Sequence, residues 1–262
     1  MAAYAEIVVF PVLPIGMRGA FAAETGWMLH RLDAFERSRR RAGINLERVY
    51  LTNTPQGPIT IAYHEGVRKT QSSRRSVSES DYGAAFTSSQ DIFDEDFMTR
   101  VKVLHGLTQE GMAGLLPRQL YVDYNAEPEV RQPGVGFALA ILPNMTNKWL
   151  ELCSELQGGR HRAFSAFNER LGCTVHRVGL YRDTAVDIAC IYLEGNYQGL
   201  PTALLGQGDF ENWLAQSFRD VYGEVPDARA ITLSDPVWDW VDGGQNIDIA
   251  PLFTRMSASL PE

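Results

Sequence analysis

The side chains best suited to acid–base chemistry lie on one predicted hairpin, residues 47–65. His64 ends a largely apolar stretch, and an imidazole titrates near neutral pH, so His64 is the best candidate for a general base. Arg48 and Tyr50 lie on the preceding predicted strand, where they could polarise a carbonyl or phenol oxygen. The simpler alternative is that His64 is an ordinary strand-end residue and that the arginine only forms an ion pair, with Glu47, Glu65 or Glu194 as partner.

Arg177 and Tyr181 offer the same chemistry again, because the chain contains itself twice. Placing residues 13–66 on 142–195 without a gap, at an offset of 129, matches 14 of 54 positions. So long a copy indicates a duplicated domain that packs on its twin about a pseudo-two-fold axis. Shared residues report the fold, whereas matched positions that differ are where a pocket could have specialised: Tyr50/Gly179, Thr52/Tyr181, Glu47/His176 and His64/Leu193.

The elements that position these residues follow the same order in both copies. Each opens with a β-branched or apolar run closed by proline, residues 5–13 and 136–142, which predicts a buried strand. Apolar residues at helical spacing predict helices over 16–42 and 144–171, with an interruption near His161, and Gly43 and Gly172 follow the last turns. Hairpins at 47–53/58–65 and 176–181/185–194 come next. Second helices follow at 91–105 and 209–222, the latter with Asp209 as N-cap.

Strand alternation places Arg48, Tyr50 and Thr52 on one face of the hairpin and Val49 on the other. If Val49 faces the helices, the polar set faces away from them. Residues 120–124 and 230–233 predict a fourth strand in each copy, which completes the order β-α-β-β-α-β of a ferredoxin-like unit. The predicted segments are 1–130 for the first repeat, 131–235 for the second and 236–262 for a capping tail without counterpart; a polar loop at 67–81 is present in the first copy alone.

In this order and duplication the chain resembles the dimeric α+β barrel superfamily, which includes the antibiotic-biosynthesis monooxygenases, the stress-responsive barrel proteins and the tandem chlorite dismutase-like haem proteins. The resemblance covers about residues 5–235 and implies an α+β fold in which two tandem ferredoxin-like sheets close a single pseudo-two-fold barrel with a pocket inside. A sheet covered by helices on one face must bury its other face, and the fused twin is the nearest apolar surface.

The resemblance also raises the question of haem, since tandem members can bind it through a histidine of the second repeat. His161 and His176 are then the candidate haem ligands. The first expectation is nevertheless that no cofactor is needed, and no spacing of histidines and carboxylates suggests a metal site.

Composition narrows the classes of partner. A net charge of −8 repels nucleic acid and anionic membranes, no apolar run is long enough to span a bilayer, and the N-terminal residues lack the basic region of a signal peptide. We therefore expect a cytoplasmic protein, compatible with a homo-oligomer, that binds a small and mostly apolar organic molecule. The expected function is a cofactor-independent monooxygenase, cyclase or isomerase; the alternatives are a haem protein of the chlorite dismutase-like kind and a non-catalytic binding or assembly protein.

Overall fold

A computed structural model describes residues 2–10, 26–54, 57–68, 92–105, 119–127, 131–182, 186–195, 200–204, 206, 208–225 and 236–242. The chain divides into two compact units. One comprises Met1–Val49, Ala62–Pro117 and Val237–Glu262, and the other comprises Tyr50–Ile61 and Arg118–Pro236. Each is described by itself below.

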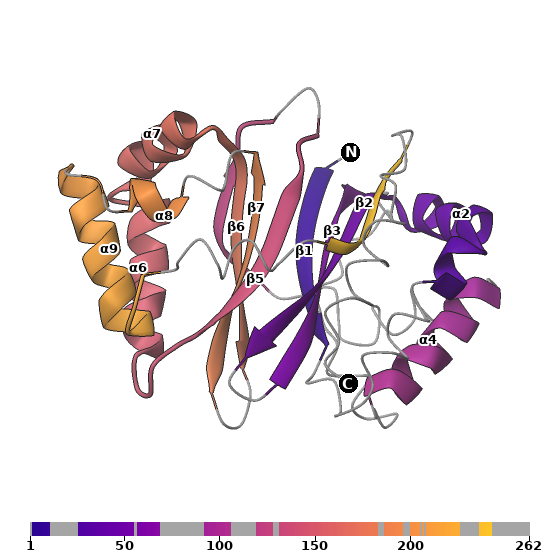
Figure 1. Ribbon diagram of the computed structural model, residues 1–262. Helices are drawn as coiled ribbons and strands as arrows, with labels where there is room; N and C mark the ends of the chain where they lie inside the picture. The colour runs from indigo at the N-terminus through magenta and orange to yellow at the C-terminus, as the bar shows by residue number, and fades with distance from the viewer. Residues whose placement is uncertain are drawn as a thin grey trace. The chain divides into compact units, whose positions relative to one another are not determined.

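The first sheet has the strand order β1-β3-β2-β8. Its strands are β1 (Ala2–Phe10), β2 (Ile44–Thr54), β3 (Gly57–Arg68) and β8 (Pro236–Val241). Helices α2 (Leu32–Ala42) and α4 (Ile92–His105) lie beside this sheet (Figure 1). Phe35 of α2 packs edge-on against Trp238 and Trp240 of β8, with ring centroids 4.8 and 5.4 Å apart. These three fully buried aromatic side chains fix α2 on the sheet.

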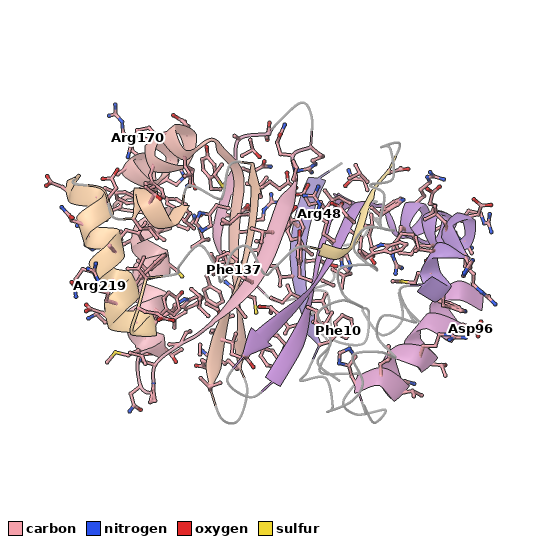
Figure 2. The ribbon with its side chains drawn as sticks, viewed as in Figure 1. Phe10, Arg48, Asp96, Phe137, Arg170 and Arg219 are labelled. Carbon is pink, nitrogen blue, oxygen red and sulfur yellow. The ribbon has the colours of Figure 1, made fainter. Side chains whose placement is uncertain are left out.

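The second sheet has the order β4-β6-β7-β5, and every neighbouring pair is antiparallel. Its strands are β4 (Leu120–Asn125), β5 (Gly134–Ala140), β6 (Cys173–Arg182) and β7 (Asp187–Gly195). Helices α6 (Thr146–Gln157), α7 (His161–Leu171), α8 (Leu200–Ala203) and α9 (Asp209–Tyr222) lie on one face (Figure 1). Arg170 and Arg219 mark the exposed sides of α7 and α9, while Phe137 of β5 belongs to the core beneath the helices (Figure 2).

The helices follow the predicted positions with two differences. The region 144–171 forms two helices, because Gly158-Gly159-Arg160 interrupts it at the predicted break. Of the region 16–42, residues 16–25 lie outside the described part, 26–29 form one helical turn and α2 starts at Leu32. Gly208, not Asp209, is the N-cap of α9. Gly43 and Gly172 end α2 and α7 as predicted, with left-handed φ of 78° and 74°.

The fourth strands are exchanged between the repeats. β4, from the first predicted segment, pairs with β6 in the second sheet, and β8 lies beside β2 in the first sheet. Residues 236–241, predicted as the start of a tail without counterpart, are therefore a strand. Their Trp-Asp-Trp pattern around Asp239 corresponds to Val-Asp-Tyr around Asp123 in β4. The fourth strand predicted at 230–233 lies outside the described residues.

The α+β class and the two four-stranded ferredoxin-like units are thus confirmed. Closure of the two sheets into one barrel stays a prediction, and residues 69–81 of the polar loop lie outside the described part. Among the helices described, none is long and apolar enough to cross a membrane.

Candidate functional site

The two faces of the first sheet carry different residues. Val49 of β2 packs on the core formed by α2 and the β8 tryptophans. Because strand residues alternate, Arg48 and Tyr50 point to the opposite face, which agrees with the alternation expected from the sequence. Both side chains are buried there.

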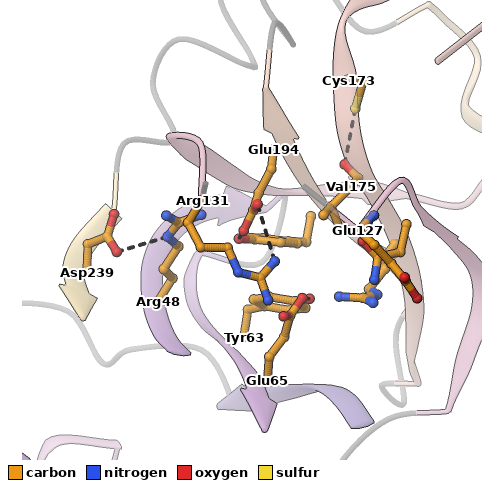
Figure 3. Close-up of polar contacts among 12 residues, drawn as sticks. Arg48, Tyr63, Glu65, Glu127, Arg131, Cys173, Val175, Glu194 and Asp239 are labelled. Carbon is orange, nitrogen blue, oxygen red and sulfur yellow. Dashed lines mark hydrogen bonds and ion pairs between the residues drawn. The ribbon is translucent and has the colours of Figure 1, made fainter. Parts of the chain in front are cut away.

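Arg48 and Arg177 are held in equivalent ion pairs. Arg48 Nε donates to Asp239 Oδ1 at 2.9 Å, and Arg177 Nε donates to Asp123 Oδ1 at 2.7 Å (Figure 3 shows the first). In each of these two pairs the carboxylate comes from the exchanged fourth strand, whereas the sequence had offered Glu47, Glu65 and Glu194 as partners. Since both copies keep this pair, it belongs to the scaffold that joins each exchanged strand to its sheet.

A tyrosine–glutamate pair is also duplicated on this face. Tyr192 donates its hydroxyl proton to Glu194 at 2.5 Å, and Tyr63 does the same to Glu65. Arg131 adds an ion pair to the fully buried Glu194 at 3.5 Å (Figure 3). Both repeats contain these pairs, as they do the Arg–Asp pairs, so we ascribe them to the common scaffold.

Tyr50 and Tyr181, the two predicted aromatic partners, differ from each other. Tyr50 is fully buried, and its ring lies against Gly136 of β5, where a Cβ would come within 2.4 Å of Tyr50 Cδ2. Tyr181 is partly exposed and lies opposite Ile188 in the β6–β7 ladder. The Tyr50 ring therefore packs over a glycine, and its role as a polarising group stays a prediction.

His64 lies on the other face of the first sheet, in a buried cluster of four charged side chains from four elements. Its Nε2 lies 3.2 Å from Glu47 Oε2, and its Nδ1 lies 3.3 Å from Glu6 Oε1. Glu47 in turn accepts a 2.6 Å hydrogen bond from Arg39 Nε of α2. We call Glu6, Arg39, Glu47 and His64 the charged cluster. All four are at most 9% exposed.

Mutual attraction outweighs burial in the charged cluster. Burial disfavours a charged imidazole, but Glu47 and Glu6 raise the pKa of His64 to about 9. Burial likewise disfavours the Glu47 carboxylate, but Arg39 and His64 lower its pKa to about 2. At neutral pH His64 is therefore an imidazolium whose two N–H groups face two carboxylates, and it is not poised as the free base expected from the sequence.

The predicted site residues thus fall into two groups. Arg48 and Tyr50 lie on one face of the first sheet, and His64 lies on the face toward α2, where Glu47 joins it. Sequence reasoning missed Glu6 and Arg39 as its partners. A signal was present, because Glu47 and His64 are both positions at which the two copies differ.

In the second repeat, the positions equivalent to the charged cluster hold neutral side chains. At the offset of 129 the equivalents of Glu6, Arg39, Glu47 and His64 are Val135, Asn168, His176 and Leu193. Leu193 is the ladder partner of both Val135 and His176, which confirms the spatial match.

His176 is buried and neutral. Asn168 Nδ2 donates to the Phe164 carbonyl at 2.9 Å, so its Oδ1 faces His176 Nδ1 at 3.1 Å and accepts the ring proton. Burial lowers the pKa of His176 to about 4. The same scaffold position therefore folds around one His–Asn hydrogen bond and aliphatic contacts, without any charge.

A cavity of about 20 Å³ lies between the second sheet and its helices, with His176 in its wall. A water molecule needs roughly 10–15 Å³, so this cavity holds about one small molecule and has no room for a haem. His161, the other candidate ligand, is an exposed residue at the start of α7. Haem binding stays an untested alternative.

Across the part of the chain that the structure describes, no group of three or more histidines, cysteines or carboxylates could hold a metal ion. Cys153, Cys173 and Cys190 are buried thiols outside any disulfide. Burial raises the pKa of both Cys153 and Cys173 to about 12, so these two are inert rather than nucleophilic.

Comparison with known proteins gives structural neighbours but no sequence family. No family model and no curated protein matches the chain. A "putative monooxygenase" from Fusobacterium nucleatum aligns over 94% of this chain and 97% of its own, with 9% identity and a TM-score of 0.47. An anthrone oxidase-like protein aligns over 93% and 95%, with 11% identity and a TM-score of 0.45. A "putative monooxygenase" from Lactobacillus acidophilus aligns over 84% of this chain and 89% of its own, with 8% identity and a TM-score of 0.45.

Proposed function

We propose that this chain is a cofactor-independent oxygenase acting on a small, mostly apolar organic molecule, with the charged cluster as its proton-transfer site. The observation that carries the proposal is the contrast between the copies. Two acids and two bases are buried in the first repeat at positions where the second folds with valine, asparagine, histidine and leucine. Buried ion pairs are weak contributors to stability, whereas groups with perturbed pKa values gather at functional sites.

The arrangement gives each member of the cluster a different role. Arg39 anchors Glu47 through the shortest contact, 2.6 Å, and Glu47 orients the His64 ring. Glu6 forms the longest contact, 3.3 Å, and the side chains of Glu6 and His64 are each 11% exposed against 3% for Glu47. A substrate therefore approaches on the Glu6–His64 side, where the imidazolium charge stabilises an oxyanion that develops on a carbonyl or phenol.

The proposed reaction needs no bound cofactor. Glu6 accepts a proton from a carbon next to the substrate carbonyl, and the positive charge of His64 stabilises the enolate. The enolate carbon forms a bond to dioxygen and reduces it to a peroxide on that carbon. The same carbon then loses its second proton as the O–O bond breaks, which leaves a new carbonyl. The departing oxygen takes up the two protons as water, so that R₂CH₂ + O₂ gives R₂CO + H₂O. This site lies on the side of the first sheet toward α2.

The test transplants the neutral set of the second repeat into the first, as Glu6→Val, Arg39→Asn, Glu47→His and His64→Leu in one variant. With 1,8-dihydroxyanthrone as the probe and oxygen uptake as the readout, we expect the transplant to lose turnover by about 10²–10⁴-fold. Its melting temperature should stay the same or rise, because replacing buried charges by packed neutral groups is neutral or stabilising. His161→Gln, on the exposed start of α7, is the control and should keep full turnover.

Two results would contradict the proposal. A transplant that turns over the probe like the wild type would show that the charged cluster takes no part in the chemistry. A transplant that melts several degrees lower would show instead that the cluster serves the fold of the first repeat.

A further inference from the structure

The cavity in the second repeat has a size and a wall that suit one class of molecule. Its volume of about 20 Å³ leaves room for a diatomic or a single water. Nine of the thirteen side chains that line it are hydrocarbon, contributed by β4, β6, β7 and the helices. The other four are Trp149, Cys153, His176 and Tyr222.

Three of the polar atoms in those four side chains form hydrogen bonds with protein groups. Trp149 Nε1 donates to the Tyr222 hydroxyl oxygen at 2.7 Å, and His176 Nδ1 is bonded to Asn168. Burial keeps each titratable group neutral, since it raises the pKa of the Cys153 thiol and the Tyr222 phenol and lowers that of His176. The wall is therefore uncharged and mostly hydrocarbon, and cavities with apolar walls take up apolar gases.

We infer that this cavity is a binding site for molecular dioxygen. Dioxygen is small, uncharged and apolar, and it dissolves better in hydrocarbon than in water, so a mostly hydrocarbon-lined cavity of this size favours it. The inference rests on the proposed function in one respect, since an oxygenase consumes dioxygen as its second substrate. The cavity and its wall belong to the second repeat, whereas the charged cluster belongs to the first.

The experiment measures gas binding directly and requires no turnover. Under dioxygen pressure, paramagnetic relaxation of ¹³C-labelled methyl groups should be enhanced at Leu152 and Ile191, which line the cavity, above the level at Val135, which lies in the same core but not in the wall. Xenon, an apolar probe of similar size, should compete for the site and remove the excess relaxation.

Val178→Ile is the matched filling variant, because Val178 lines the cavity and the change adds one carbon to its wall. We expect this variant to lose the relaxation excess and xenon binding and to keep its melting temperature. In turnover of 1,8-dihydroxyanthrone, the KM of this variant for dioxygen should be higher than that of the wild type, and its kcat should be unchanged. Val225→Ile, which packs on the same core without lining the cavity, should behave like the wild type.

The outcomes separate this inference from the proposed function. Absence of excess relaxation at Leu152 and Ile191 in the wild type would overturn the dioxygen site, whatever the enzyme does with a substrate. If Val178→Ile no longer binds dioxygen in the cavity but keeps the wild-type KM for dioxygen, the cavity does not supply dioxygen to the reaction. Loss of turnover in the charged-cluster transplant alone, with gas binding intact, bears only on the proposed function.

Discussion

At the scale of single residues, His64 of the charged cluster and His176, which replaces Glu47 in the second repeat, have opposite electrostatics. His64 is stabilised as a cation by two carboxylates, and His176 is stabilised as a neutral ring by burial and one amide. The sequence could show that Glu47/His176 and His64/Leu193 differ. It could not show that both differences meet on one face, because that depends on the register of β2 against β3 and on the placement of α2.

This contrast predicts pH dependences of opposite sign. The pKa of His64 is raised from 6.5 to about 9, so its contribution to stability is complete below pH 6.5 and is lost as the pH rises through 9. The loss is on the order of 3 kcal/mol. Urea denaturation between pH 6.5 and 9 should show the wild type losing stability that the His64→Leu variant does not lose.

His176 provides the internal control for that measurement. Its pKa is lowered from 6.5 to about 4, so the folded state excludes a proton that the unfolded state binds. Stability from this residue is present above pH 6.5 and is lost as the pH falls toward 4. If the free energy of unfolding of His64→Leu and of His176→Leu changed with pH in the same way, the charged state of His64 and the neutral state of His176 would both be contradicted.

At the scale of elements, the exchanged strands β4 and β8 are held by the two Arg–Asp pairs. Arg48 and Asp239 have side chains 2% exposed each, whereas Asp123 is 52% exposed beside a buried Arg177. Removing one partner of a fully buried pair costs about 3–5 kcal/mol, and an exposed pair contributes about 0–1 kcal/mol. Asp239→Asn should therefore destabilise the protein severalfold more than Asp123→Asn. Chemical denaturation of the two isosteric variants checks this order.

The same elements show how far the sequence leads. The pattern of residues 47–53 and 58–65 predicted the hairpin that β2 and β3 form, and the glycines predicted where α2 and α7 end, because these features are local. The partner of β8 was not predictable, since Pro236–Val241 lies far along the chain from β2. The pattern of two tryptophans flanking an aspartate is compatible with a capping segment and with a strand. Only the pairing with β2 distinguishes the two.

At the scale of the whole molecule, segments of each half of the sequence contribute to both compact units. The tip of the β2–β3 hairpin, Tyr50–Ile61, belongs to the unit built on the second sheet, and β8 belongs to the first. The chain therefore crosses between the units several times. This connection predicts one cooperative unfolding transition, with Asp239→Asn and Asp123→Asn both shifting the same single midpoint.

The contact of Tyr50 with Gly136 gives the sharpest test of that cooperativity. A Cβ on Gly136 would lie 2.4 Å from the Tyr50 ring, and the centroid of the Tyr192 ring lies 6.2 Å from that of Tyr50. Gly136→Ala should therefore destabilise the protein by roughly 1–3 kcal/mol, the usual result of overpacking. Tyr50→Leu in the same chain removes the clash, so the double variant should be more stable than the sum of the two single changes predicts. Differential scanning calorimetry of the four proteins measures the coupling free energy. Additive single changes would show that the hairpin tip does not pack on β5, and a second transition in Gly136→Ala would show that the units unfold independently.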